Sequence, residues 1–253
     1  MTPALIAALG LLMVATAFLS GLFGMAGGLI LIGVLLAIMP LPAAMVLHAA
    51  TQMASNGWRA VLWRRHIRWR PVAVYLVGCA LALGLWSLIR YVPDTPMALL
   101  LLGITPFMAR LMPPSLKPDP DSVWQGAIYG TICMGLMLMT GVSGPLLDTF
   151  FLGARFDRRS IVATKATCQV ASHLTKLIYF GGIIDQAAGL DPVLALVAVA
   201  ASMLGTSLAR RLLEAMSEQQ FRIWATRIIT AVASYYILYG GWLLLAAQSS
   251  AAE

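Results

Sequence analysis

The sequence predicts an all-α polytopic membrane protein, and three observations support this prediction. The chain of 253 residues is 60% hydrophobic and only 11% charged, with a mean hydropathy of +0.85. Apolar stretches long enough to cross a bilayer recur along the chain, and Lys and Arg gather in the loops between them. Soluble domains carry about 25% charged residues. The composition therefore excludes a soluble enzyme, a disordered chain and, despite a net charge of +7, a nucleic-acid-binding protein.

Ten apolar stretches follow one another, and eight approach the roughly 20 residues that a transmembrane helix needs. The other two, 28–39 and 145–153, are too short to cross comfortably, and we expect them to be half-helices. The first stretch lacks the charged start of a signal peptide, so we expect it to belong to the mature protein. In chain order the stretches are 3–23, 28–39, 42–63, 71–91, 96–112, 122–140, 145–153, 160–183, 190–209 and 221–246.

A glycine-rich break precedes each half-helix. The first break reads Gly24-Met25-Ala26-Gly27-Gly28, and the second reads Gly141-Val142-Ser143-Gly144-Pro145. Short apolar segments interrupted by Gly or Pro at corresponding places in two halves are typical of broken helices in transporters. The sequence therefore predicts a substrate site beside the two breaks.

The two breaks belong to two copies of one unit. When the chain is shifted by 117 residues, segment 24–59 falls on 141–176 without a gap, and nine positions are identical. We therefore expect a first transmembrane repeat at 1–111, a cytoplasmic Pro-rich linker at 112–120, and a second, inverted transmembrane repeat at 121–253. The identical pairs are Gly24/Gly141, Gly27/Gly144, Leu29/Leu146, Leu35/Leu152, Ala37/Ala154, Ala49/Ala166, Gln52/Gln169, Ala54/Ala171 and Ser55/Ser172.

The basic residues set the orientation, because cytoplasmic loops are enriched in Lys and Arg. Four loops and their flanks hold 12 of the 17 basic residues. All four can be cytoplasmic only if each broken unit, 3–39 and 122–153, is a hairpin, which inverts the second repeat and makes both termini periplasmic. The alternative is one long crossing per broken unit, which makes the repeats parallel. The twelve residues are Arg64, Arg65, Arg68, Arg70, Arg110, Lys117, Arg155, Arg158, Arg159, Arg210, Arg211 and Arg222.

A polar stripe runs along the apolar stretch that follows each half-helix. In the first repeat its members at i, i+4, i+7 and i+11 occupy an arc of about 60° on a helix. Such residues could simply hold helices together, or snorkel toward the membrane surface. We favour a substrate site because the stripe occurs twice, each time close to a glycine break. The stripe residues are His48, Thr51, Gln52, Ser55, Asn56 and Arg59 in the first repeat and Lys165, Gln169, Ser172, His173 and Lys176 in the second.

The sign of the charge indicates an anionic substrate. The basic stripe residues are accompanied by one acid deep in an apolar stretch, Asp148, which either pairs with Lys165 or carries a coupling proton. Half-helices that begin near residues 28 and 145 also aim free N–H groups and positive dipole ends at the same region. The candidate site residues contributed by the breaks are Gly24, Gly27, Gly28, Gly141, Ser143 and Gly144.

The breaks, together with His48-Ala49-Ala50-Thr51-Gln52 and Lys165-Ala166-Thr167-Cys168-Gln169, resemble those of the TauE/SafE family of sulfite exporters, over essentially the whole chain. The resemblance implies a multi-pass permease of the bacterial inner membrane that moves sulfite, a sulfonate or a related small sulfur-containing anion. It also implies no cofactor, and it makes the breaks and the stripes of Gln52 and Gln169 the substrate region. Which anion, the direction of transport, the coupling ion and assembly as a homodimer stay open.

Two other functions fit single motifs. Gly141-Val142-Ser143-Gly144 matches the Gly-x-Ser-Gly motif of rhomboid intramembrane serine proteases, with His173 as the base. The first break lacks the serine, however, and His173 corresponds to Asn56. A metal-transport site built from His48, Cys168 and His173 would lack carboxylates. We therefore expect no catalytic residue and no metal site.

Overall fold

The computed structural model describes residues 2–113, 119–152, 156–184 and 191–250. Within these ranges the chain forms ten α-helices and no β-strand, which confirms the predicted all-α class. A 3₁₀ turn, η1 (Arg64–His66), follows the third helix, and a π-helical turn, η3 (Tyr179–Ile183), follows the eighth. The helices are α1 (Pro3–Phe23), α2 (Ala26–Ile38), α3 (Leu41–Leu62), α4 (Trp69–Ile89), α5 (Thr95–Leu111), α6 (Val123–Thr140), α7 (Gly144–Leu152), α8 (Arg158–Ile178), α9 (Pro192–Ala215) and α10 (Glu218–Ser250).

Aspartates cap three of these helices at their N-termini, where unpaired backbone N–H groups favour an acidic acceptor. Asp94 accepts from the backbone of α5, Asp157 from that of α8, and Asp191 from that of α9. At Asp157, hydrogen bonds from the Ser160 hydroxyl and from the backbone N–H groups of Arg159 and Ser160 lower the pKa of the carboxyl. The loops thus fix where α5, α8 and α9 begin.

Gly24 and Gly141 end α1 and α6 with positive φ angles of 72° and 82°. The first break is shorter than the sequence predicts, because α2 already begins at Ala26 and includes Gly27 and Gly28 in its first turn. Gly27 lets α2 fold back closely against α1, since a Cβ there would collide with the backbone of Thr16. The half-helices α2 and α7 span 13 and 9 residues, close to the predicted ranges.

In two helix pairs, α1 with α9 and α4 with α6, the helices run in the same direction. Each pair joins a helix from the first half of the chain to one from the second half. Gly10 on α1 faces Val197 on α9, and further along both helices Gly21 faces Ala209, so α1 and α9 run in the same direction. Helices α4 and α6 pair in the same way, and glycines again allow close backbone approach. The contacts that fix the direction of the second pair are Val74 with Gly126, Gly78 with Gly130, and Trp86 with Gly135.

Two further pairs run antiparallel and join equivalent helices of the two halves. His48 on α3 contacts Lys176 on α8, while Gly57 later in α3 faces Val170 earlier in α8. Helices α5 and α10 are antiparallel as well. Their contacts are Leu100 with Gly240, Gly103 with Ile237, and Arg110 with Thr226 and Thr230. Helices α3 and α8, and likewise α5 and α10, therefore run in opposite directions.

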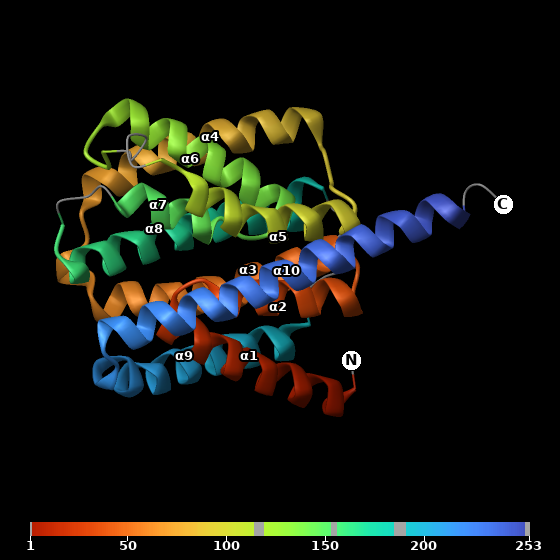
Figure 1. Ribbon diagram of the computed structural model, residues 1–253, viewed down its shortest axis with the longest axis horizontal. Helices are drawn as coiled ribbons and strands as arrows, with labels where there is room; N and C mark the ends of the chain where they lie inside the picture. The colour runs from red at the N-terminus through yellow and green to blue at the C-terminus, as the bar shows by residue number, and fades with distance from the viewer. Residues whose placement is uncertain (1, 114–118, 153–155, 185–190, 251–253) are drawn as a thin grey trace.

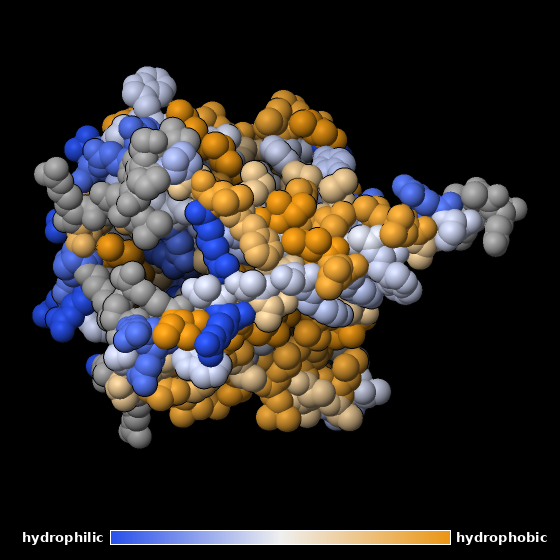
Figure 2. Space-filling model, in the orientation of Figure 1, coloured by the Kyte–Doolittle hydropathy of each residue, from blue (hydrophilic) through white to orange (hydrophobic). Residues whose placement is uncertain are grey.

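The molecule has one hydrophilic end, which we name the basic end. It contains the turn between α3 and α4, with Arg64 and Arg65, the start of α8 and the turn between α9 and α10 (Figure 1). At the other end, named the opposite end, lie the start of α1 and the end of α10. Figure 2 shows hydrophilic residues gathered at the basic end and apolar residues over most of the remaining surface on this face. This distribution fits a bundle of helices that crosses a membrane.

Among the described residues, five helices are long and apolar enough to span a membrane, namely α1, α4, α6, α9 and α10. The sequence predicts about eight spans, and the difference has physical causes. Helix α5 has only 17 residues, and polar stripes lower the hydropathy of α3 and α8. Helix α10, with 33 residues, projects beyond the other helices at the opposite end (Figure 1). It exposes Trp224 and Trp242.

Candidate anion-binding site

The antiparallel crossing of α3 and α8 brings the two polar stripes together. Because His48 meets Lys176 and Gly57 faces Val170, the crossing is centred near Ala54 and Ala171. These two alanines are superposed by the 117-residue shift. The stripes therefore face one another about this centre, and their residues form three layers between the two ends of the molecule.

Two glutamines form the middle layer. Gln52 and Gln169 are buried, with exposed fractions of 6% and 8%. A Cβ added to Gly28 would lie 3.3 Å from Gln52 Oε1, and one added to Gly144 would lie 3.7 Å from Gln169 Nε2. Each amide is therefore placed beside the first turn of a half-helix. Gln52 Nε2 has no hydrogen-bond partner among the described residues, so a buried donor is left for a ligand.

A hydrogen-bonded chain forms the layer toward the opposite end. Lys176 Nζ lies 2.7 Å from His48 Nδ1 and donates to the carbonyl oxygen of Gly141 at 3.0 Å. His48 Nε2 lies 3.0 Å from the carbonyl oxygen of Gly28. The His173 ring packs edge-on against that of His48, with centroids 5.4 Å apart. All three side chains are buried, so this layer is closed to water.

A second set of charged groups forms the layer toward the basic end. Lys165 is ion-paired with Asp148 of α7, and their side chains are 17% and 36% exposed. Lys165 also lies beside the first break, because a Cβ on Gly24 would be 3.6 Å from its Nζ. Arg59 donates to the carbonyl oxygen of Ser20 at 3.0 Å and to Asn56 Oδ1 at 3.5 Å. This layer is partly open.

The two breaks touch each other. A Cβ on Gly144 would lie 2.8 Å from the Cβ of Met25, and Gly141 packs against Ile32 and Met45. The hydroxyl of Ser143, between these glycines, is buried and has no hydrogen-bond partner in the described ranges. The half-helices α2 and α7 therefore begin side by side, and an unpaired hydroxyl lies at their junction.

Several stripe residues instead bond to neighbouring helices. Ser55 Oγ lies 2.9 Å from Thr206 Oγ1 on α9, and Ser172 Oγ lies 2.9 Å from the Tyr75 hydroxyl on α4. The hydroxyl of Thr51 donates to the carbonyl oxygen of Leu47 within α3, and Asn56 Nδ2 to that of Gln52. Ser55 and Ser172 thus hold neighbouring helices together, whereas the bonds of Thr51 and Asn56 stay within α3.

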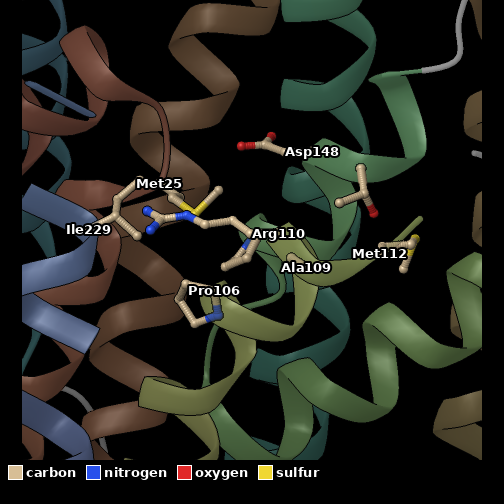
Figure 3. Close-up of a pocket in the computed structure, with 9 residues that line it drawn as sticks. Met25, Pro106, Ala109, Arg110, Met112, Asp148 and Ile229 are labelled. Atoms are coloured by element: carbon tan, nitrogen blue, oxygen red, sulfur yellow. The ribbon is translucent and has the colours of Figure 1, made fainter. Parts of the chain in front are cut away.

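A cavity of about 260 Å³ opens beside the breaks, between α5, α7, α10 and the start of α2 (Figure 3). It reaches one residue of each break, Met25 and Pro145, and the Asp148 that pairs with Lys165. The guanidinium of Arg110 extends toward Met25, and it donates to Thr230 Oγ1 at 2.7 Å. The sequence indicated only that Arg110 orients the chain, because its place near the linker gives no sign that α5 lines a cavity.

The two alternative motifs do not assemble into sites. Ser143 Oγ has no hydrogen-bond partner in the described ranges, so it makes no bond to His173 and the serine protease dyad is not formed. Across the residues that the structure describes, no group of three His, Cys, Asp or Glu side chains could hold a metal ion. The clustered side chains are instead hydrogen-bond donors and cations, with Asp148 as the acid ion-paired among them.

A family model gives an independent line of comparison. The model of the sulfite exporter TauE/SafE family matches residues 8–236 of the 253-residue chain. Searches of curated proteins and of solved structures found no match. The match covers both breaks, both stripes and eight of the ten described helices completely, with most of α1 and α10. Members of this family are membrane transporters and not enzymes. The chain therefore belongs to the TauE/SafE family of sulfite exporters.

Proposed function

We propose that this protein is a secondary transporter that moves sulfite, an organosulfonate or a related small sulfur-containing anion across the bacterial inner membrane. The observation that carries the proposal is the meeting of unpaired donors and excess positive charge where α2 and α7 begin. Gln52 Nε2 and Ser143 Oγ are buried without partners, and Lys165 and Lys176 lie on either side of the glutamine layer. A small anion that accepts several hydrogen bonds complements such a set.

The anion binds in the middle layer, between Gln52 and Gln169. There the free N–H groups of the first turns of α2 and α7 supplement the side-chain donors, because a helix N-terminus favours negative charge. Lys165 contributes charge from the basic end, and Lys176 contributes it through its hydrogen-bonded chain. The full set of proposed substrate-binding residues is Gly24, Gly27, Gly28, His48, Thr51, Gln52, Ser55, Asn56, Arg59, Gly141, Ser143, Gly144, Lys165, Gln169, Ser172, His173 and Lys176.

The two halves are inverted repeats in this proposal. The helix directions support this. Helices α3 and α8 are antiparallel, as are α5 and α10, and the parallel pair α1 and α9 corresponds to the parallel pair α6 and α4. Inversion superposes His48 and Arg59 on Lys165 and Lys176, so it exchanges the two charged layers. Alternating access then consists of opening one layer while the other closes. The open cavity at Asp148 and the sealed pair of Lys176 and His48 correspond to one of these two states.

The basic end faces the cytoplasm in this arrangement, following the distribution of Arg residues. The cavity beside Arg110 is then the cytoplasmic entrance, and both termini are periplasmic. A cationic guanidinium at the entrance attracts anions and repels cations.

Flux of radiolabelled sulfite into proteoliposomes tests the function. Vesicles that contain the protein should accumulate labelled sulfite faster than empty vesicles, and unlabelled methanesulfonate or sulfite should compete. A protein in which Gln52 and Gln169 are both changed to Ala should lose most of the flux. Flux no greater than in empty vesicles, for sulfite and for methanesulfonate, would refute the proposal.

A further inference from the structure

Lys176 is a fully buried amino group without an acidic partner among the described residues. Its exposed fraction is 0%, and no carboxylate of the described residues lies within ion-pair distance of its Nζ. Its hydrogen-bond partners are His48 Nδ1 and the carbonyl oxygen of Gly141. A buried ammonium that lacks a counter-charge is strongly disfavoured, so it either loses its proton or acquires an anion.

The groups around Lys176 offer no negative charge. The titratable groups that interact with it are His48 from α3 and His173 from α8 itself. Helix α4 contributes Tyr75 and Cys79, which contact Ser172 one turn away. Helix α6 contributes a buried thiol, Cys133, and the carbonyl at its end. Asp148 of α7 is already paired with Lys165.

The hydrogen bonds also define the proton positions in this chain of groups. The carbonyl oxygen of Gly28 can only accept, so His48 Nε2 carries a hydrogen and donates it. His48 Nδ1 is then the acceptor, and Lys176 Nζ donates to it. If Nδ1 were protonated while Lys176 carried its ammonium, two positively charged N–H groups would face each other at 2.7 Å. The pair therefore holds a single additional proton, shared between Nζ and Nδ1.

This pair lies one helical turn from the proposed anion site. His48 precedes Gln52 by four residues on α3, so their side chains share a face. Gly141, whose carbonyl binds Lys176, belongs to the same break as Ser143 and Gly144. An anion held by the glutamines supplies the negative charge that Lys176 lacks.

We propose that the pair of Lys176 and His48 is a proton-binding site that fills together with the anion, so that the protein co-transports about one proton with each anion. This inference rests on the proposed anion transport. The neutral amine of Lys176 takes up the proton when the anion arrives and releases it when the anion leaves. Where the empty protein is unprotonated, anion affinity should rise about tenfold for each unit decrease in pH, because each anion then binds with one proton.

Calorimetric titration of the purified protein with methanesulfonate tests this co-binding. Methanesulfonate is the anion of a strong acid and does not titrate near neutral pH, so any proton taken up binds to the protein. Titrations at one pH in two buffers of different ionisation enthalpy give the number of protons per anion. The wild-type protein should take up about one proton, and His66→Gln, in the turn outside the site, should behave identically. Lys176→Arg, which keeps its proton at every working pH, should bind methanesulfonate without proton uptake.

The outcomes separate this inference from the proposed function. Binding of methanesulfonate by the wild type without proton uptake, and with an affinity independent of pH, overturns the co-binding and leaves anion transport standing. Proton uptake that persists in Lys176→Arg but disappears in Asp148→Asn moves the proton to Asp148 and also overturns the inference. Absence of binding for both methanesulfonate and sulfite removes the proposed function and this inference with it. If Lys176→Arg does not fold, Asp148→Asn decides, because its proton uptake should persist if the proton binds at Lys176 and disappear if it binds at Asp148.

Discussion

Gly24 and Gly141 lie 117 residues apart and are the two glycines of the described chain with positive φ, at 72° and 82°. Each ends one helix and directs the chain into a half-helix. A left-handed backbone is costly for a residue with a Cβ, so glycine is required at both positions. Both breaks therefore begin with a glycine of positive φ, while ψ differs, at −100° for Gly24 and −6° for Gly141.

Gly24→Ala and Gly141→Ala should each destabilise the protein by about 1–3 kcal/mol, because alanine in these conformations is strained. Gly141→Ala should be the more severe, since its Cβ would lie 2.9 Å from Met45 Sδ, whereas the nearest atom at Gly24 is 3.6 Å away. The control is Gly241→Ala, in the interior of α10 with no atom within 4 Å, which should be neutral or stabilising. Thermal unfolding in detergent micelles measures all three, and equal effects at 24 and 241 would contradict the strain argument.

Gln52→Ala and Gln169→Ala should each weaken binding of sulfite roughly 10- to 150-fold, because a hydrogen bond to a charged partner contributes about 1.5–3 kcal/mol. Thr167→Ala on α8 is the matched control, since its hydroxyl donates only to the carbonyl of Ala163. Calorimetric titration gives the dissociation constants. Unchanged affinity in the double glutamine variant would mean that these amides only pack helices together.

Asp148→Asn should tighten sulfite binding, because it leaves the ammonium of Lys165 without its carboxylate partner. When Asp148→Asn is combined with Lys165→Met, the increase in sulfite affinity should disappear. The effects of the two substitutions should therefore be non-additive in a double-mutant cycle. Flux and affinity are measured in parallel. Loss of binding in folded Asp148→Asn would instead place Asp148 in direct contact with the substrate.

Reporter fusions test the orientation of the chain. A periplasm-active reporter should be active when joined after Ser250 and inactive when inserted in the turn that contains Arg64 and Arg65. A cytoplasm-active reporter should give the reverse pattern. An active cytoplasmic reporter at the C-terminus would contradict the predicted orientation.

The sequence predicts the helices and both breaks well, because span length and glycine content are local properties. It also predicts that the stripes face inward, since spacings of four and seven residues share a helix face. The crossing of α3 and α8 near Ala54 and Ala171 is seen only in the structure, because residue spacing along one helix does not fix which helix packs against it.

Contacts among three or more helices could not be predicted in this way. An arc of about 60° places Ser55 and Gln52 on one face, but that face is shared by several neighbours, and Ser55 bonds to α9. The close approach of Lys176 to His48 was equally hidden, because two basic residues are expected to repel unless one is neutral. The position of Arg110 at the cavity could not be predicted either, because the sequence does not show that α5 lines a cavity.

Helix α10 also relates the protein to its bilayer. Trp224 and Trp242 are both exposed on it and are separated by 18 residues, which corresponds to about 27 Å along a helix. The hydrocarbon core of a bilayer is about 30 Å thick, and tryptophan side chains prefer its two headgroup boundaries. The spacing of the two indoles therefore matches the distance between the two headgroup boundaries, and their preference for these boundaries fixes the depth of α10 in the bilayer.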